Sequence, residues 1–159
     1  MSVTTAAQSR PGLVRSAAGT RRPWATRPVW LVGTLATAAG AAVTEVFTLA
    51  ARGLGVPMAA ATGGAREAAA IPVGGFAMAV VLSSVAGVVL AMALARWAKR
   101  PARTFVIVTG VLTALSLVEP LAFTVHTAVS TQLVLALSHL VAAAVIVPPL
   151  ARRLAHRRA

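Results

Sequence analysis

Four long apolar runs alternate along the chain with short polar segments that are mostly basic. The runs cover approximately residues 29–51, 71–97, 104–123 and 128–150. Each is close to the ~20 residues that a helix needs to cross the hydrocarbon core of a bilayer. Backbone polar groups must be bonded internally in lipid, and alternation with a period of two is absent, so the runs indicate helices. The pattern therefore predicts four transmembrane helices.

The composition supports burial in lipid. Hydrophobic residues make up 58% of the 159 residues, charged residues make up 11%, and the mean hydropathy is +0.82. A soluble fold of this length could not bury so much apolar surface. We expect one transmembrane domain at 29–150, preceded by a disordered basic tail at 1–28 and followed by a basic tail at 151–159.

The basic residues predict the orientation of the helices. Thirteen of the 15 Lys and Arg residues fall in the two tails or near the loop at 98–103, and only Arg52 and Arg66 fall elsewhere. The positive-inside rule then places both termini in the cytoplasm, and Trp24, Trp30 and Trp97 lie at the same interface. The predicted fold class is an all-α integral membrane four-helix bundle with antiparallel up-down connectivity, N-in and C-in, in the bacterial cytoplasmic membrane.

The net charge of +12 raises the question of partners. Its confinement to tails and one loop favours contact with anionic lipid headgroups at the cytoplasmic face, and Tyr is absent, so we expect no nucleic-acid binding. Cysteine is also absent, and His126 and His156 have no neighbours at ligand spacing, so we expect neither a metal nor a cofactor.

Small residues recur every fourth position along the second run. Such a stripe lets helix backbones approach closely in lipid. Packing inside the bundle is the favoured interpretation, and a homodimer seam is the alternative. The stripe consists of Gly75, Ala79, Ser83, Gly87, Ala91 and Ala95.

A few polar residues interrupt the apolar runs, and ionisable groups at such depth are costly unless they are paired or neutral. Glu45 and Glu119 each lie ~8 Å from the middle of their runs on the outer side, at 1.5 Å per residue. We interpret Glu45, Glu119, His139 and Gln132 as a candidate intramembrane cluster. It is either a hydrogen-bonded staple, which we favour, or a site that relays protons or binds a cation or an amphiphile. Arg52 either extends outward or pairs with Glu45.

No catalytic residues are assigned. The chain has no metal-binding His/Glu motif, no acidic phosphotransfer motif and no Ser–His elbow. Ser138 and His139 are sequence neighbours, so their side chains diverge on a helix. The expected function is that of a non-enzymatic, multi-pass envelope or accessory protein. The alternative is a small proton- or ion-coupled transporter that uses the Glu/His cluster.

Several short segments also resemble a known family. They are Ala51-Arg-Gly-Leu-Gly-Val56, Arg100-Pro-Ala-Arg-Thr-Phe105, Leu115-Ser-Leu-Val118 and Ser138-His-Leu-Val-Ala-Ala-Ala-Val-Ile-Val-Pro148. They are similar to an uncharacterised family of small four-span membrane proteins, known from actinobacteria as a domain of unknown function. The resemblance implies a four-helix membrane architecture, and it implies no activity, substrate or catalytic residue.

Overall fold

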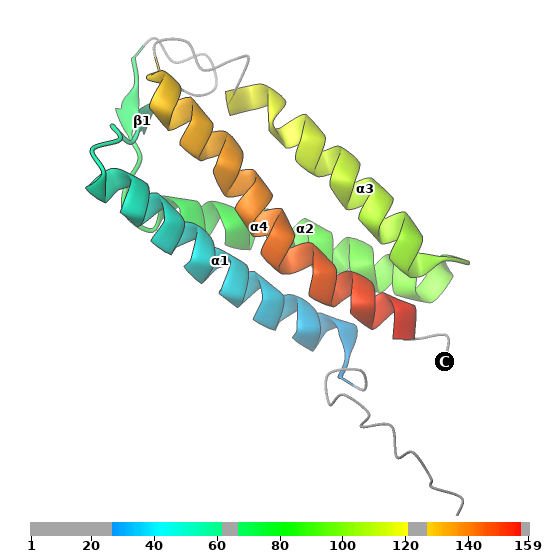
Figure 1. Cartoon of the computed structure of the whole chain (residues 1–159). Helices are drawn as coiled ribbons and strands as arrows, with labels where there is room; N and C mark the ends of the chain where they lie inside the picture. Colours follow the sequence, from blue (N-terminus) through cyan, green and yellow to red (C-terminus); the bar gives the residue numbers. More distant parts are fainter. Residues whose placement is uncertain (1–26, 62–66, 121–126, 157–159) are drawn as a thin grey trace, which may run out of the picture.

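The computed structural model describes residues 27–61, 67–120 and 127–156, and it confirms an all-α bundle (Figure 1). A short antiparallel ladder, in which Ala59 pairs with Ala70, joins the first helix to the second. The predicted disordered tail lies almost wholly outside the described residues. The elements are α1 (Val29–Gly53), β1 (Ala59–Ala60), β2 (Ala69–Ala70), α2 (Gly75–Trp97), α3 (Pro101–Ser116) and α4 (Val129–Ala155).

Three of these helices, α1, α2 and α4, are long and apolar enough to cross a bilayer. The third helix, α3, is apolar but has only 16 residues, and an irregular helical segment continues from it to Pro120. The outer surface of the bundle carries many exposed large apolar side chains, among them Leu35, Leu82 and Ile107. A surface of this kind is stable in contact with lipid and not with water, so the fold is that of a membrane protein.

The helix ends differ from the expected runs for local reasons. The second helix begins at Gly75, four residues later than the apolar run, because Gly74 takes a left-handed φ of 84° and closes a turn in which Gly75 N–H bonds to Pro72 O. The third begins at Pro101, since proline fits the first helical position. The fourth continues to Ala155.

Close helix packing is concentrated on α1. This helix packs against α2 and α4, whereas α3 packs mainly against α4. A Cβ atom on Gly33 would lie 2.7 Å from the Val88 side chain of α2, and one on Gly40 would lie 2.6 Å from the Ile146 side chain of α4. The two glycines are seven residues apart, so they fall on the same face of α1. The absence of a side chain at these two glycines therefore allows α1 to pack closely against α2 and α4.

Two hydrophobic clusters close the two ends of the bundle. We call the end that carries β1 and β2 the hairpin end, and the end where α1 begins and α4 finishes the terminal end. The cluster at the hairpin end consists of Ala51, Met58, Phe76 and Val134. The cluster at the terminal end consists of Val29, Val32, Ala91, Phe105, Leu150 and Leu154. Since Ala91 and Phe105 meet there, α2 and α3 are in contact at the terminal end.

Candidate functional site

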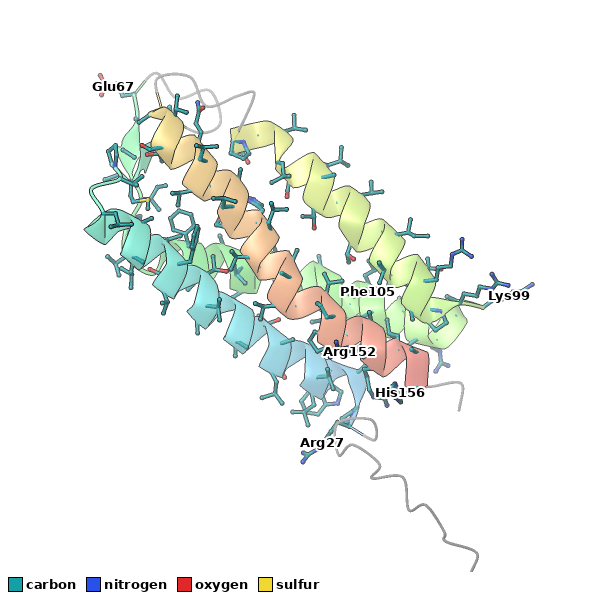
Figure 2. All side chains as sticks on the ribbon, viewed as in Figure 1. Arg27, Glu67, Lys99, Phe105, Arg152 and His156 are labelled. Atoms are coloured by element: carbon teal, nitrogen blue, oxygen red, sulfur yellow. The ribbon has the colours of Figure 1, made fainter. Side chains whose placement is uncertain are left out.

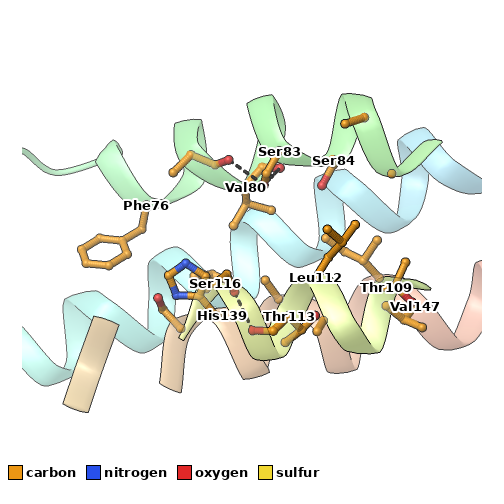
Figure 3. A pocket seen from close by; sticks show the side chains of 18 of the residues that line it. Phe76, Val80, Ser83, Ser84, Thr109, Leu112, Thr113, Ser116, His139 and Val147 are labelled. Carbon is orange, nitrogen blue, oxygen red and sulfur yellow. Dashed lines mark hydrogen bonds between the residues drawn. The ribbon is translucent and has the colours of Figure 1, made fainter. Parts of the chain in front are cut away.

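A cavity of about 750 Å³ lies between the two clusters. Its walls come from α2, α3 and α4, with Thr44 as the contribution of α1, and most of its lining is apolar (Figure 3). Phe76 lies at one end and Phe105 at the other, and each belongs to the cluster that closes that end. The cavity therefore lies among the helices, and Ile71, from the segment before α2, is the described lining residue outside them.

The cavity opens between α2 and α3. Ala79 and Ser83 of α2 and Leu112 of α3 line it and are exposed, whereas Phe105 and Leu150 line it and are buried. The open side therefore faces the apolar exterior of the bundle, and a hydrophobic molecule could enter from lipid.

Most hydroxyl groups of the lining are already bonded within their own helices. Ser83 donates to Ala79 O at 2.8 Å, Thr109 to Phe105 O at 2.7 Å, and Ser116 to Thr113 O at 2.7 Å. Such back-bonding to the preceding turn is common for Ser and Thr in apolar surroundings. These side chains therefore add little polarity to the cavity.

Thr44 differs from them. Its side chain is 1% exposed, and its Oγ1 has no hydrogen-bond partner among the described residues. An unpaired buried hydroxyl costs free energy of order 1–3 kcal/mol. Thr44 lines the cavity, so its unbonded hydroxyl belongs to the cavity wall.

His139 is the one titratable residue among the described residues of the lining. Its Nδ1 lies 2.7 Å from Leu135 O in the preceding turn. A carbonyl only accepts, so Nδ1 carries the proton, and Nε2 of the neutral ring is then an acceptor. Figure 3 shows the imidazole at the same end of the cavity as Phe76 and Ser116. The cavity therefore has one polar end.

Glu45 is engaged elsewhere. Its Oε1 accepts the Gly74 N–H at 2.7 Å and its Oε2 accepts the Ala77 N–H at 3.0 Å. Both donors belong to the N-terminus of α2, which has no cap from its own side chains. A carboxylate is favoured there because it pairs with unbonded N–H groups and with the positive end of the helix dipole.

Arg52 binds the segment that leads into the same helix end. Its Nη2 donates to Ile71 O at 2.8 Å, and its Nε is buried without a partner among the described residues. Of the two predicted alternatives, an outward extension or a pair with Glu45, the hydrogen bond supports neither directly. Instead, Arg52 binds the segment before α2, and Glu45, two turns earlier on α1, binds the first turn of α2.

The structure describes hydrogen bonds for two of the four residues of the predicted polar cluster. The hydrogen bonds of Glu45 and His139 described above go to backbone groups on different helices. Glu119 is exposed beyond the end of α3, and Gln132 is half-buried in the first turn of α4. A direct meeting of these four residues stays a prediction.

The small-residue stripe of α2 divides into two parts. Ala91 is fully buried in the cluster at the terminal end, and Ala95 packs against that cluster. The other four residues line the cavity, and a Cβ on Gly87 would meet no atom within 4 Å. The small side chains of this part therefore provide space.

Sequence patterns alone did not indicate three of the residues that shape this site. They are Thr44, which lies within an apolar run, and the glycine pair Gly33 and Gly40. The spacing of seven between these glycines was the available signal, since it places both on one helix face. Thr44 had no such signal, because its unpaired hydroxyl depends on the packing of three other helices.

Several charged residues lie at the two ends of the bundle. Figure 2 shows Arg27, Lys99, Arg152 and His156 toward the terminal end and Glu67 at the hairpin end. At the terminal end, the buried Arg153 donates through Nε to the carbonyl of Arg27, which ties α4 to the chain before α1.

Comparison with known families gives one match. The model described as "Family of unknown function (DUF6069)" matches residues 24–156. The chain belongs to this family. The matched region includes all four helices and therefore the whole described lining of the cavity. Searches of curated proteins and of solved structures gave no match.

Proposed function

We propose that this member of DUF6069 is a non-enzymatic integral protein of the bacterial cytoplasmic membrane that holds a hydrophobic ligand in the cavity between α2, α3 and α4. The observation that carries the proposal is the cavity itself, of about 750 Å³. Small-molecule sites typically have ~300–1,000 Å³ and mostly apolar walls. Both ends of this bundle are closed by packed clusters, so the space between them is a local feature of the fold.

The hydrogen bonds of the lining favour binding over catalysis. Ser138 Oγ and His139 Nδ1 each lie 2.7 Å from the same acceptor, Leu135 O. An activated serine would need its proton directed to a histidine nitrogen. Here the serine proton is directed to the backbone instead, so the adjacent pair is not a nucleophile with its base.

The proposed orientation places both termini in the cytoplasm. It is supported by the concentration of Lys and Arg at the terminal end and by the exposed Trp30 and Trp97 near the same end. Anionic headgroups at the cytoplasmic face are then the proposed lipid partners. Reporter fusions after Ala159 and at Gly63 test this: an extracellular C-terminus contradicts the orientation.

Two glycine substitutions test the cavity. Gly87→Leu places a large side chain in the cavity wall, whereas Gly110→Leu places it on the exposed face of α3, where a Cβ also meets nothing within 4 Å. We expect native mass spectrometry of protein extracted with its surrounding lipid to show a retained hydrophobic adduct on the wild type and on Gly110→Leu. The adduct should be lost in Gly87→Leu. Equal retention in both variants, or no adduct on the wild type, contradicts the proposal.

A proton-coupled transporter is the second candidate, and the observation that favours it is the imidazole of His139 in the lining. The other residue considered for proton transfer, Glu45, has both carboxylate oxygens bonded to backbone N–H groups of α2. Proteoliposomes loaded with a pH-sensitive dye distinguish the candidates. Ligand-dependent acidification that is lost in His139→Gln supports transport, and a constant internal pH supports binding alone.

A further inference from the structure

We infer that the ligand of this cavity is an uncharged single-chain lipid whose head group is a hydroxyl, and that the head group lies between Thr44 and His139. The inference rests on the proposed function and narrows it to one ligand class. The chemistry of the head group is inferred from Thr44 Oγ1 and His139 Nε2, two polar atoms with a free hydrogen-bonding position. The hydrocarbon chain is inferred from the polarity and length of the remaining wall.

Thr44 requires a partner that nothing described in the chain provides. It lies on the α1 face that closes the cavity, is 1% exposed, and has an unbonded Oγ1. Nearby Thr48 is equally buried at 2% exposed, but its Oγ1 donates to Glu45 O at 3.0 Å. The two threonines are one turn apart, and only the one in the cavity wall has an unbonded hydroxyl. A ligand oxygen is the group that could accept its proton.

His139 offers the complementary group. Because Nδ1 donates to Leu135 O at 2.7 Å, the neutral ring has its lone pair on Nε2. A ligand that donates to His139 and accepts from Thr44 would satisfy both groups. A hydroxyl does both with a single oxygen, whereas an ether or an ester only accepts.

The two residues lie at nearly the same level of the bundle. The contact between Gly40 and Ile146 sets the register of the antiparallel helices α1 and α4. Thr44 is four residues beyond Gly40, and His139 is seven residues before Ile146. At 1.5 Å per residue they differ by roughly 4.5 Å along the axis, so the proposed head group lies at a depth common to both.

The lining excludes charged head groups. No described residue that lines the cavity is Arg, Lys, Asp or Glu, so a phosphate, carboxylate or ammonium group would be buried without a counter-charge. Toward the terminal end the walls are mostly apolar, with Val108, Ile146, Val147 and Leu150, and the hydroxyls on this side are those of Ser84 and Thr109. From His139 to Leu150 the wall extends roughly 16 Å along α4. This length and polarity suit one hydrocarbon chain that enters through the opening between α2 and α3.

Hexadecanol and hexadecyl methyl ether are matched probes, since they share a chain and differ in the hydroxyl proton. We expect the wild-type protein in lipid nanodiscs to bind the alcohol about five- to tenfold more tightly than the ether, as expected for one neutral hydrogen bond. In protein labelled with ¹⁵N-histidine, the alcohol should shift the non-protonated ring nitrogen of His139. The signals of His126 and His156 serve as references. The ether should leave the His139 nitrogen unchanged.

Two threonine variants complete the test. Thr44→Val removes the unbonded hydroxyl at nearly constant volume, and we expect about fivefold weaker alcohol binding. Thr48→Val, outside the described lining, should bind the alcohol like the wild type. Equal binding of alcohol and ether with an unchanged His139 signal overturns the inference and leaves the proposed function standing. If neither probe binds, the proposed function itself is wrong.

Discussion

The carboxylate of Glu45 on α1 accepts the backbone N–H of Gly74 at 2.7 Å, and so caps the first turn of a neighbouring helix. Gly74 has a left-handed backbone and no side chain with which to cap α2 itself. A second bond, from Ala77 N–H to the other carboxylate oxygen, makes the contact bidentate. The charge of Glu45 is thereby placed where a helix dipole favours it, within an otherwise apolar span.

Removing this cap should destabilise the bundle. We expect Glu45→Ala to lower the free energy of unfolding by about 2 kcal/mol, because two part-buried N–H groups lose a charged acceptor. Glu45→Gln keeps one acceptor oxygen and should cost roughly half as much by the same argument. Denaturation followed by circular dichroism in detergent measures both. Glu67→Ala, which removes an exposed carboxylate near β2, is the control and should change little. An unchanged stability of Glu45→Ala contradicts a structural role for the cap.

The four apolar runs predict the four helices, because the length and apolar character of a single segment are sufficient to indicate a transmembrane helix. The start of α2 was harder, since it depends on the turn at Gly74 and on a carboxylate 29 residues away. The sequence predicts that Glu45 joins a cluster with Glu119, His139 and Gln132. Its partners are backbone N–H groups, which every residue carries, so no sequence pattern identifies them.

The cavity was beyond prediction for a different reason. Small residues in a transmembrane helix indicate either close helix approach or an open space, and the sequence is the same in both cases. Gly33 and Gly87 illustrate the two outcomes: a Cβ on Gly33 would clash with Val88, and a Cβ on Gly87 would meet nothing within 4 Å. The difference depends on the packing of α3 mainly against α4, which is a property of the whole bundle.

Two buried threonines should respond in opposite ways to the same substitution. Thr44→Val removes an unpaired hydroxyl, so in ligand-free protein we expect an unchanged or slightly higher free energy of unfolding, by up to ~1 kcal/mol. Thr131→Val removes the donor that holds Pro57 O near the hairpin, and should cost ~1 kcal/mol. Unfolding in detergent after delipidation measures both. A loss of stability in Thr44→Val would show that its hydroxyl has a partner within the fold.

Two adjacent arginines on α4 allow the contribution of a hydrogen bond to stability to be distinguished from the contribution of a positive charge. Arg153 is buried and donates to Arg27 O, whereas Arg152 is exposed. Both Arg153→Gln and Arg152→Gln remove one positive charge from the terminal end. We expect a loss of about 1–2 kcal/mol of unfolding free energy in Arg153→Gln and less than ~0.5 kcal/mol in Arg152→Gln. Equal losses in the two variants would mean that charge alone, and not the tie to Arg27, matters at this end.

Close approach of α1 and α2 at Gly33 gives the most stringent test of the packing. A leucine there would overlap the β-branched side chain of Val88, whose Cγ2 lies 2.7 Å from the position of a Cβ, so we expect Gly33→Leu to cost about 1–3 kcal/mol of stability. Val88→Ala, made in the same chain, should recover much of the loss, because it removes the overlapping atoms. Gly110→Leu adds the same side chain on an exposed face of α3 and should be nearly neutral. A double-mutant cycle of unfolding free energies measures the coupling, and additive effects of the two substitutions would contradict the contact between Gly33 and Val88.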